Sequence, residues 1–294
     1  MKEKPFSKYH ISINVVMMLW TIIIVLPFLL LFLSSITDET ALVANGYSFF
    51  PKKFSLASYS YIIKSGGVIL RAYGVSIVVT LVGTLLNVLL SALMAYPLSI
   101  KNLPGRKFMM FFVFFTMLFN GGIVPSYIMW TGTFHVKDTI FAQLLPNFLL
   151  SAWNVMMIRT YFTSSIPDGL YEAAEIDGAS QFTIFWKIVL PLGKPILVTM
   201  GTFAGLAYWN DWYNCMLYIT NEDMFTLQYY LQRMLGSAEA MRIVAEKSGI
   251  ALPSVPLESM KMAMTVIATG PIVLLYPFVQ RYFVKGLTIG AVKG

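Results

Sequence analysis

The sequence predicts an all-α, polytopic membrane protein with six transmembrane helices. Of its 294 residues, 57% are hydrophobic and 12% are charged, about half the charged fraction of roughly 25% that soluble domains carry. A soluble domain of this length would have too few charged side chains to cover its surface, and a disordered chain would need low hydrophobicity. The single cysteine, Cys215, excludes an internal disulfide.

Six apolar runs are long enough to cross a hydrocarbon core about 30 Å thick, which takes roughly 20 helical residues. Backbone groups within lipid must bond to one another, so each run is most simply an α-helix. In chain order the runs are 13–33, 72–96, 108–130, 140–158, 195–219 and 260–280. The first run exceeds the roughly 7 to 15 apolar residues of a signal peptide and has no clear cleavage site, which predicts an uncleaved anchor.

The basic residues of the short loops set the orientation in the membrane. With the N-terminus in the cytoplasm, twelve of the 21 Lys and Arg residues lie on the cytoplasmic side. The predicted parts are a cytoplasmic segment, 1–12, a transmembrane domain, 13–281, and a cytoplasmic tail, 282–294, so both termini are cytoplasmic. Because the basic residues spread along the inner membrane face, the net charge of +7 does not indicate a nucleic-acid-binding protein.

A long cytoplasmic link, about 160–194, joins the fourth and fifth runs, although most helix hairpins turn within a few residues. Pro167 stops the preceding chain, and Asp168 is expected to cap a helix with further acidic residues near its N-terminus. Gly178 then turns the chain, and a second short helix ends near Pro191. The link therefore predicts two short helices along the membrane surface that present small residues and carboxylates to a partner.

The letters YEAAEIDGASQFTIFWKIVLP within this link resemble the EAA loop of ABC importer permeases. Other stretches are similar to carbohydrate-type permeases, above all the branch that serves complex oligosaccharides and polysaccharide fragments; they are NGYSFFPKKFSLASY, MLFNGGIVPSYI, AYWNDWYN and QRYFVKGLTIGAVKG. The resemblance implies a permease subunit whose EAA loop is the cytoplasmic coupling helix for a separate ATPase. The residues that it assigns to this contact are Glu172, Ala173, Ala174, Asp177, Gly178, Ile188, Leu190 and Pro191.

The resemblance also implies that the chain is a multi-pass protein of a bacterial cell membrane, and it implies several partners. They are a second, different permease, a dimeric cytoplasmic ATPase, an extracytoplasmic solute-binding protein, an oligosaccharide substrate and membrane lipid, with no cofactor. The sequence has no G-x-x-x-x-G-K-[ST] motif for phosphates. The chain itself is therefore not expected to hydrolyse ATP or to be an enzyme.

Two alternatives stay open at this point. The first is an intramembrane glycan-processing enzyme, which would need catalytic carboxylates or a metal cluster within the runs. Asp211 is the only acid there, and the two histidines, His10 and His135, are isolated, so no metal site is expected. The second is an ABC permease for a solute other than a sugar.

Aromatic and polar residues near the outer end of the fifth run form a candidate substrate path: Tyr208, Trp209, Asn210, Asp211 and Trp212. Aromatic rings cover the apolar faces of sugars, and Asn and Asp bind sugar hydroxyls. A carboxylate at mid-membrane costs on the order of 2.5 to 3.5 kcal/mol, so Asp211 is expected to face a wet cavity or a partner. The alternative is an interfacial aromatic belt with an acid that extends toward water.

Glycines mark two further positions in the runs. In the third run, Asn120 and Gly121, with Gly122, would weaken the helix and either open the translocation path or let neighbouring helices pack closely. In the fifth run, Gly201 and Gly205 have the small-xxx-small spacing of a helix contact. The outer loop, 220–259, has mixed charge and is either a folded docking segment or a solvated connector.

Overall fold

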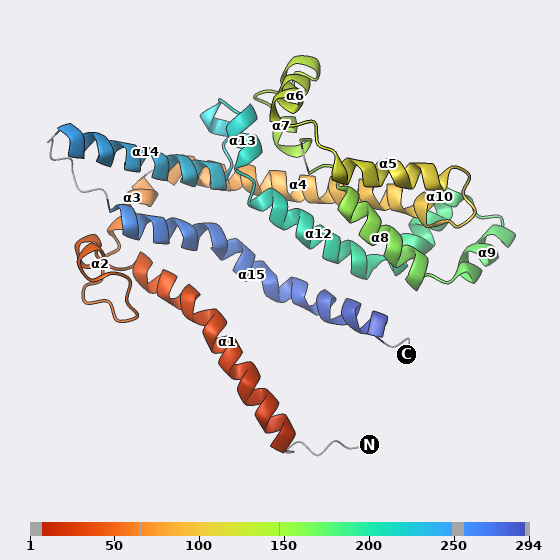
Figure 1. The fold of residues 1–294 in the computed structure, drawn as a ribbon, viewed down its shortest axis with the longest axis horizontal. Coiled ribbons are helices and arrows are strands. Elements are labelled where there is room, and N and C mark those ends of the chain that lie inside the picture. Colours follow the sequence, from red (N-terminus) through yellow and green to blue (C-terminus); the bar gives the residue numbers. More distant parts are fainter. Residues whose placement is uncertain (1–7, 65, 147, 249–255, 292–294) are drawn as a thin grey trace. The chain divides into compact units, whose positions relative to one another are not determined.

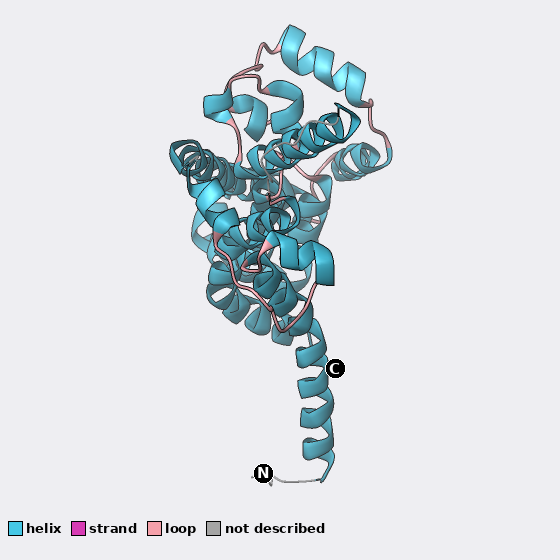
Figure 2. Ribbon diagram, turned by 90° about the vertical axis from the view of Figure 1, so that its left-hand side faces the viewer, coloured by secondary structure: helices cyan, strands magenta, loops and turns pink. Residues whose placement is uncertain are grey.

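The computed structural model describes residues 8–64, 66–146, 148–248 and 256–291. Within these ranges the regular elements are helices, and one isolated antiparallel bridge joins Thr37 and Phe54 (Figure 2). The chain divides into two compact units, Met1–Gly66 with Leu231–Pro271 and Gly67–Tyr230 with Ile272–Gly294. The predicted all-α class is confirmed for the described part of the chain.

The helices follow one another with short connections, and Figure 1 labels them along the chain. In chain order they are α1 (Lys8–Ser35), α2 (Glu39–Asn45), α3 (Ala57–Lys64), α4 (Gly66–Ser99), α5 (Arg106–Leu118), α6 (Ile123–Ile128), η1 (Met129–Thr133), α7 (Phe141–Leu144), α8 (Ala152–Ser165), α9 (Asp168–Ile176), α10 (Gln181–Ile184), η2 (Phe185–Val189), α11 (Leu190–Leu192), α12 (Lys194–Trp209), α13 (Tyr213–Tyr218), η3 (Glu222–Met224), α14 (Leu227–Ser248) and α15 (Leu257–Ala291).

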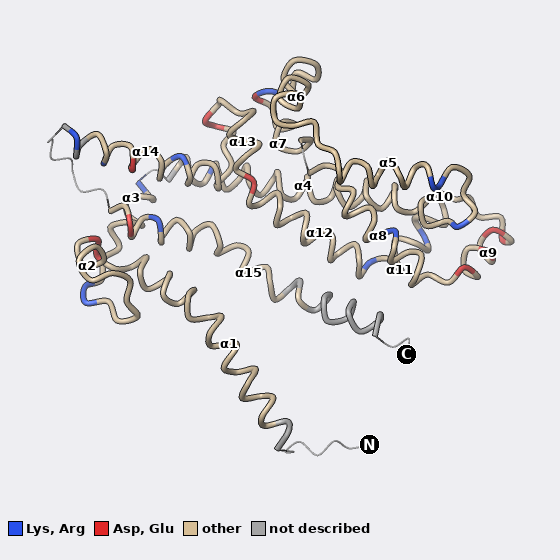
Figure 3. Tube along the Cα trace, in the orientation of Figure 1, with Lys and Arg blue, Asp and Glu red and all other residues tan. Residues whose placement is uncertain are grey.

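Three described helices are long and apolar enough to cross a membrane. They are α1 over Ile11–Ser35, α4 over Gly67–Ser99 and α15 over Leu257–Pro277. Charged residues are absent from this stretch of α1 and from α4 beyond Arg71, whereas acidic residues gather along α9 (Figure 3). Two bent helix pairs raise the number of candidate spans to five, which supports a polytopic membrane protein.

The third and fifth apolar runs are broken, so the expectation of one helix for each was wrong. In the third, α5 ends at Leu118, and the part that begins at Ile123 is bent from it by 111°. Gly122 lies between them with φ +86°, a left-handed conformation that favours glycine. In the fifth, α12 ends at Trp209 and α13 begins only at Tyr213.

The fourth run, 140–158, is not one helix either, because α7 ends at Leu144 and α8 begins at Ala152. Three buried side chains from other helices donate hydrogen bonds to carbonyl groups at this break. The pairs are Tyr208 Oη to Leu144 O (2.8 Å), Asn214 Nδ2 to Pro146 O (3.1 Å) and Asn87 Nδ2 to Phe148 O (2.5 Å). Irregular backbone at membrane depth is tolerated when protein groups satisfy it, and these donors come from distant parts of the sequence.

Two glycines of α12 pack on α4, and α8 lies beside α12 in the same unit (Figure 1). A Cβ atom at Gly201 would lie 3.3 Å from a methyl group of Val88, and one at Gly205 would lie 3.2 Å from the hydroxyl oxygen of Thr84. The predicted helix contact through Gly201 and Gly205 is therefore confirmed. Small residues here allow the two helix backbones to approach each other.

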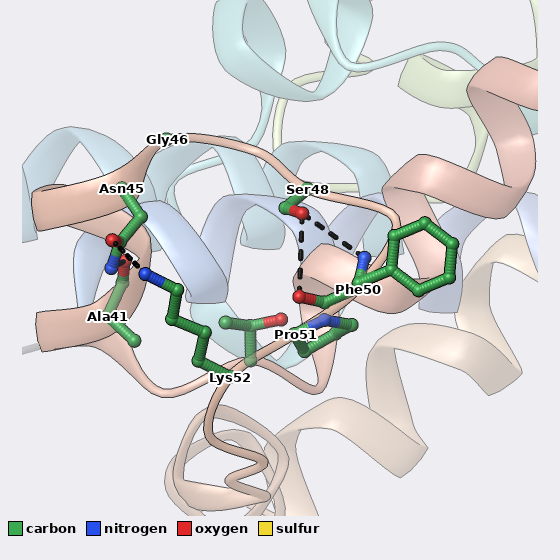
Figure 4. Close-up of a pocket in the computed structure, with 8 residues that line it drawn as sticks. Ala41, Asn45, Gly46, Ser48, Phe50, Pro51 and Lys52 are labelled. Atoms are coloured by element: carbon green, nitrogen blue, oxygen red, sulfur yellow. Dashed lines mark hydrogen bonds between the residues drawn. The ribbon is translucent and has the colours of Figure 1, made fainter.

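The first unit encloses a pocket between α2 and the segment that leads to α3. Backbone bonds close this segment, from Asp38 N to Lys53 O (3.0 Å) and from Ser55 N to Ile36 O (2.9 Å). The side chain of Lys52 crosses the pocket and donates to Asn45 Oδ1 at 3.0 Å (Figure 4). The pocket has a volume of about 260 Å³ and is lined by Thr37, Ala41, Asn45, Gly46, Ser48, Phe50, Pro51 and Lys52.

The segment 220–259 contains a helix of 22 residues, α14. This part is therefore folded, and its docking on a partner stays a prediction; residues 249–255 lie outside the described residues. At the far end of the chain, α15 continues to Ala291. No break in this helix separates the predicted tail, 282–294, from the span before it.

Candidate functional site

The link 160–194 contains a helix, a glycine turn and a second helical stretch, as predicted. The expectation that Asp168 caps α9 was wrong, because Pro167 has the extended backbone of the N-cap position and Asp168 is the first helical residue. The carboxylate of Asp168 pairs with Lys101 Nζ at 2.5 Å. Gly178 has φ +76° and ends the helix. Ser180 then caps the second stretch by accepting a hydrogen bond from Thr183 N at 3.2 Å.

Gln181 attaches the link to the transmembrane helix α4. Its amide nitrogen donates to Glu175 Oε1 at 2.9 Å, and its amide oxygen accepts from Tyr96 Oη at 2.5 Å. Tyr96 belongs to α4 and also lies beside the ring of Phe185, with centroids 5.5 Å apart. The helices on both sides of the glycine turn are thus bonded to each other and to α4 through one side chain.

The structure divides the motif residues between a buried and an exposed side. Glu172, Ala173, Asp177 and Gly178 are exposed, as is Pro191. Ala174 is buried in a core built around Phe162, Ile184 and Val189, against which Ile188 and Leu190 also pack. The expectation that Ala174 is open to a partner was wrong, because its methyl group faces the core of its own chain.

Two exposed apolar side chains flank the glycine turn and were missed in the sequence. Ile176 is 86% exposed and Phe182 is 68% exposed. Helical periodicity assigns apolar residues to the buried face, so the pattern gave no signal for them. Exposed apolar groups beside an acidic edge are typical of a surface that binds another protein or the membrane.

Asp211 bonds to the backbone of its own chain. It lies buried at the break between α12 and α13, where its Oδ1 accepts hydrogen bonds from the backbone N–H groups of Tyr213 (3.0 Å) and Asn214 (3.2 Å). Such bonds satisfy the free N–H groups at the start of a helix. The acid is therefore a cap for α13, and it does not extend toward water as the aromatic-belt interpretation required.

The aromatic residues next to Asp211 are divided in the same way. Tyr208 and Trp209 are buried, and the ring of Trp209 lies 6.2 Å from that of Tyr73. Asn210 and Trp212 are exposed, and Asn210 Nδ2 donates to Leu206 O at 2.8 Å. The structure thus leaves two of the five residues accessible to a solute from outside the chain.

Asn120 lies instead in a pocket with residues of α13. This pocket has a volume of about 230 Å³ and is lined by Asn120, Gly122, Ile123, Ser126, Tyr213, Leu217 and Tyr218. Asn120 Oδ1 accepts from Gly122 N at 2.8 Å, and a methyl group at Gly121 or Gly122 would meet no described atom within 4 Å. Close helix packing within the chain therefore does not explain these glycines. Ser126, which stands in the stretch MLFNGGIVPSYI, and Tyr218, which the sequence did not indicate, line the same pocket.

Asp138 connects the turn after η1 to the end of α13. It has φ +56°, and its carboxylate accepts bonds from the Thr220 hydroxyl (2.6 Å), Thr220 N (2.5 Å) and Asn221 N (3.0 Å). The hydrogen bond from the Thr220 hydroxyl, followed by those from the backbone, holds the pKa of Asp138 below its usual value of 3.8. The ionised carboxylate therefore stabilises this connection.

Replacing Asp138 with Asn is expected to lower the stability of the protein most at neutral pH. Because the folded-state pKa of Asp138 is lowered, its contribution is complete above about pH 4 and is lost as the pH falls through the folded-state pKa. The unfolding midpoints of the two proteins in detergent should thus converge in acid. Asp223→Asn, which removes an exposed ion pair with Arg71, is the control, and a constant difference at all pH values would contradict this role.

Comparison with known proteins places the chain among transport components. Residues 74–289 match the family described as binding-protein-dependent transport system inner membrane component. The chain is 37% identical over 272 residues to protein LplC of Bacillus subtilis, covering 92% of this chain and 90% of the relative. It is 36% identical over 278 residues to the polygalacturonan/rhamnogalacturonan transport system permease protein YtcP of the same organism, covering 95% and 96%.

A solved structure has a similar fold along nearly the whole chain. It is the crystal structure of a bacterial ABC transporter involved in the import of the acidic polysaccharide alginate. The TM-score is 0.77 at 27% sequence identity, and the match covers 95% of this chain and 99% of the other. The shared fold therefore extends over nearly the whole length of both chains.

Proposed function

The chain belongs to the family of inner membrane components of binding-protein-dependent transport systems, and on that premise we propose that its cargo is an oligosaccharide. It is a permease subunit of an ABC importer. The names of the relatives support a sugar cargo, since they concern polygalacturonan, rhamnogalacturonan, alginate and arabinooligosaccharides. The chain carries no phosphate-binding loop, so a separate ATPase subunit supplies the energy.

The exposed acidic edge from Glu172 to Gly178 is the observation that carries the proposed coupling. This edge contacts the ATPase, and closure of the ATPase dimer on ATP moves the whole link. The bonds from Gln181 to Glu175 and from Tyr96 to Gln181 transmit that movement to α4. The permease then opens toward the outside, and ATP hydrolysis resets it.

Six crossings complete the proposed topology. α1, α4 and α15 cross once each, α5 with the bent part after it supplies the third crossing, α8 with the irregular stretch before it supplies the fourth, and α12 with α13 supplies the fifth. Both termini are then cytoplasmic, as the distribution of Lys and Arg favours. In this arrangement the pocket that contains Asn120 and Tyr218 opens toward the translocation path.

The family implies three kinds of partner, an ATPase, a solute-binding protein and a second permease. We assign them as a dimeric cytoplasmic ATPase on the link, an extracytoplasmic binding protein at the outer face and a different permease that forms a heterodimer with this chain. The helix α14 is the segment of this chain offered to the binding protein, because it extends over 22 residues of the outer segment.

Uptake by the assembled importer in proteoliposomes tests the proposed cargo. With ATP and the binding protein present, labelled trigalacturonate or a neutral trisaccharide should accumulate, while a tripeptide should not. Accumulation of the peptide alone would favour a permease for another solute. Cleavage of the sugar in the absence of ATP would instead favour an intramembrane glycan-processing enzyme.

A further inference from the structure

Two arginine side chains meet at the last turn of α4. Arg106, the first residue of α5, donates from Nε to Leu98 O at 2.9 Å, and Arg159 of α8 donates from its own Nε to the same oxygen at 3.2 Å. Both arginines are partly buried. Because both Nε atoms lie within 3.2 Å of one carbonyl oxygen, two full positive charges are close neighbours at one end of a transmembrane helix.

This arginine pair, Arg106 and Arg159, has no carboxylate partner in the described ranges. The acid on the neighbouring link, Asp168, is paired with Lys101 instead. The negative end of the α4 dipole is equivalent to roughly half an elementary charge, which cannot neutralise two guanidinium groups. Arg106 has one further described acceptor, Lys101 O at 3.5 Å from Nη1. For Arg159 the described acceptor is Leu98 O, which contacts Nε. The two Nη atoms of Arg159 can therefore bind a group from outside the chain.

We propose that the arginine pair binds the phosphate group of an anionic phospholipid from the inner leaflet. A phosphate has several acceptor oxygens and a negative charge, and guanidinium groups bind it through paired hydrogen bonds. Basic sites between transmembrane helices on the cytoplasmic side are suited to lipid headgroups. The inference rests on the proposed orientation, which places Arg106 and Arg159 at the cytoplasmic surface beside the coupling link.

Lipid binding by the full chain, purified with its partner subunits, tests this site without any transported solute. Native mass spectrometry would compare the retention of phosphatidylglycerol and phosphatidylcholine. We expect the unmodified protein to prefer phosphatidylglycerol and the variant Arg106→Gln/Arg159→Gln to lose at least about tenfold in affinity for it, since charge-assisted hydrogen bonds are removed. The matched control, Lys107→Gln/Lys194→Gln, removes the same charge at the same level and should keep the preference.

Two further measurements keep the outcome decisive. The variant Arg106→Lys/Arg159→Lys retains both charges and controls for misfolding of the Gln variant. It should keep part of the preference for phosphatidylglycerol. Circular dichroism would verify that its helices are intact. An unchanged preference in the Gln variant would overturn the proposal. The proposal would also be overturned if inorganic phosphate raised the melting temperature as much as phosphatidylglycerol does, because the bound phosphate would then not need to come from a lipid. Neither result depends on whether the cargo is a sugar.

Discussion

Replacing Glu172 with Lys, or Gly178 with Asp, is expected to abolish oligosaccharide uptake while the protein remains inserted in the membrane. Both positions are exposed, so neither change disturbs the core. Asp at position 178 adds backbone strain, because φ is +76° there, although Asp tolerates this conformation better than most residues; Glu172→Lys adds no such strain. The damage therefore falls on the surface offered to the ATPase, where disrupting a charged contact costs about 2 to 5 kcal/mol.

The measurement combines uptake, ATPase activity and the amount of protein in the membrane. Uptake and stimulated ATPase activity should fall to background, with membrane content unchanged. Gly169→Asp is the control for an added acid on α9, because a Cβ atom at Gly169 meets nothing within 4 Å and an acid is favoured in the first turn; unlike Gly178, Gly169 has no positive φ, so Glu172→Lys carries the comparison that is free of backbone strain. Normal uptake by both Glu172→Lys and Gly178→Asp would refute the role of this edge in coupling.

Replacing Gly83 with Ala is expected to destabilise the second unit by about 1 to 3 kcal/mol, the usual cost of overpacking a core. The new Cβ atom would lie 2.5 to 2.7 Å from three carbons of the Tyr208 ring. That ring has little freedom to move, because Tyr208 is fully buried and its hydroxyl donates to Leu144 O. If the ring were displaced, the Leu144 carbonyl at the helix break would lose its partner, which costs more.

The denaturation midpoint in detergent measures this effect, with Gly74→Ala as the control. Gly74 lies on the same helix, and a Cβ atom there meets nothing within 4 Å, so its replacement should be neutral or slightly stabilising. In a Tyr208→Ala background, Gly83→Ala should cost nothing further, because the ring is gone. Equal destabilisation by Gly83→Ala and Gly74→Ala would show that the contact with Tyr208 is unimportant, and Tyr208 would again be a candidate for the substrate path.

Several features of the candidate site were predictable because they depend on local chemistry. Gly178 was recognised as a turn because glycine breaks a helix between two short helical stretches, and its positive φ agrees. The contact through Gly201 and Gly205 followed from spacing on one helix face. In contrast, the burial of Ala174 and the exposure of Ile176 depend on which side of α9 faces Phe162, and a helix of nine residues carries too few turns for periodicity to decide that.

The sequence by itself determined the all-α membrane class of the protein and the position of the EAA-like motif, because composition and residue spacing are properties of the chain alone. The tertiary structure decided where the runs break and what Tyr208 and Asp211 do. An apolar run is expected to be one helix unless other groups satisfy its backbone, and here donors such as Asn87 and Tyr208 lie far away in the sequence. For the same reason Asp211, which looked like an acid for a solute, is a buried cap for α13.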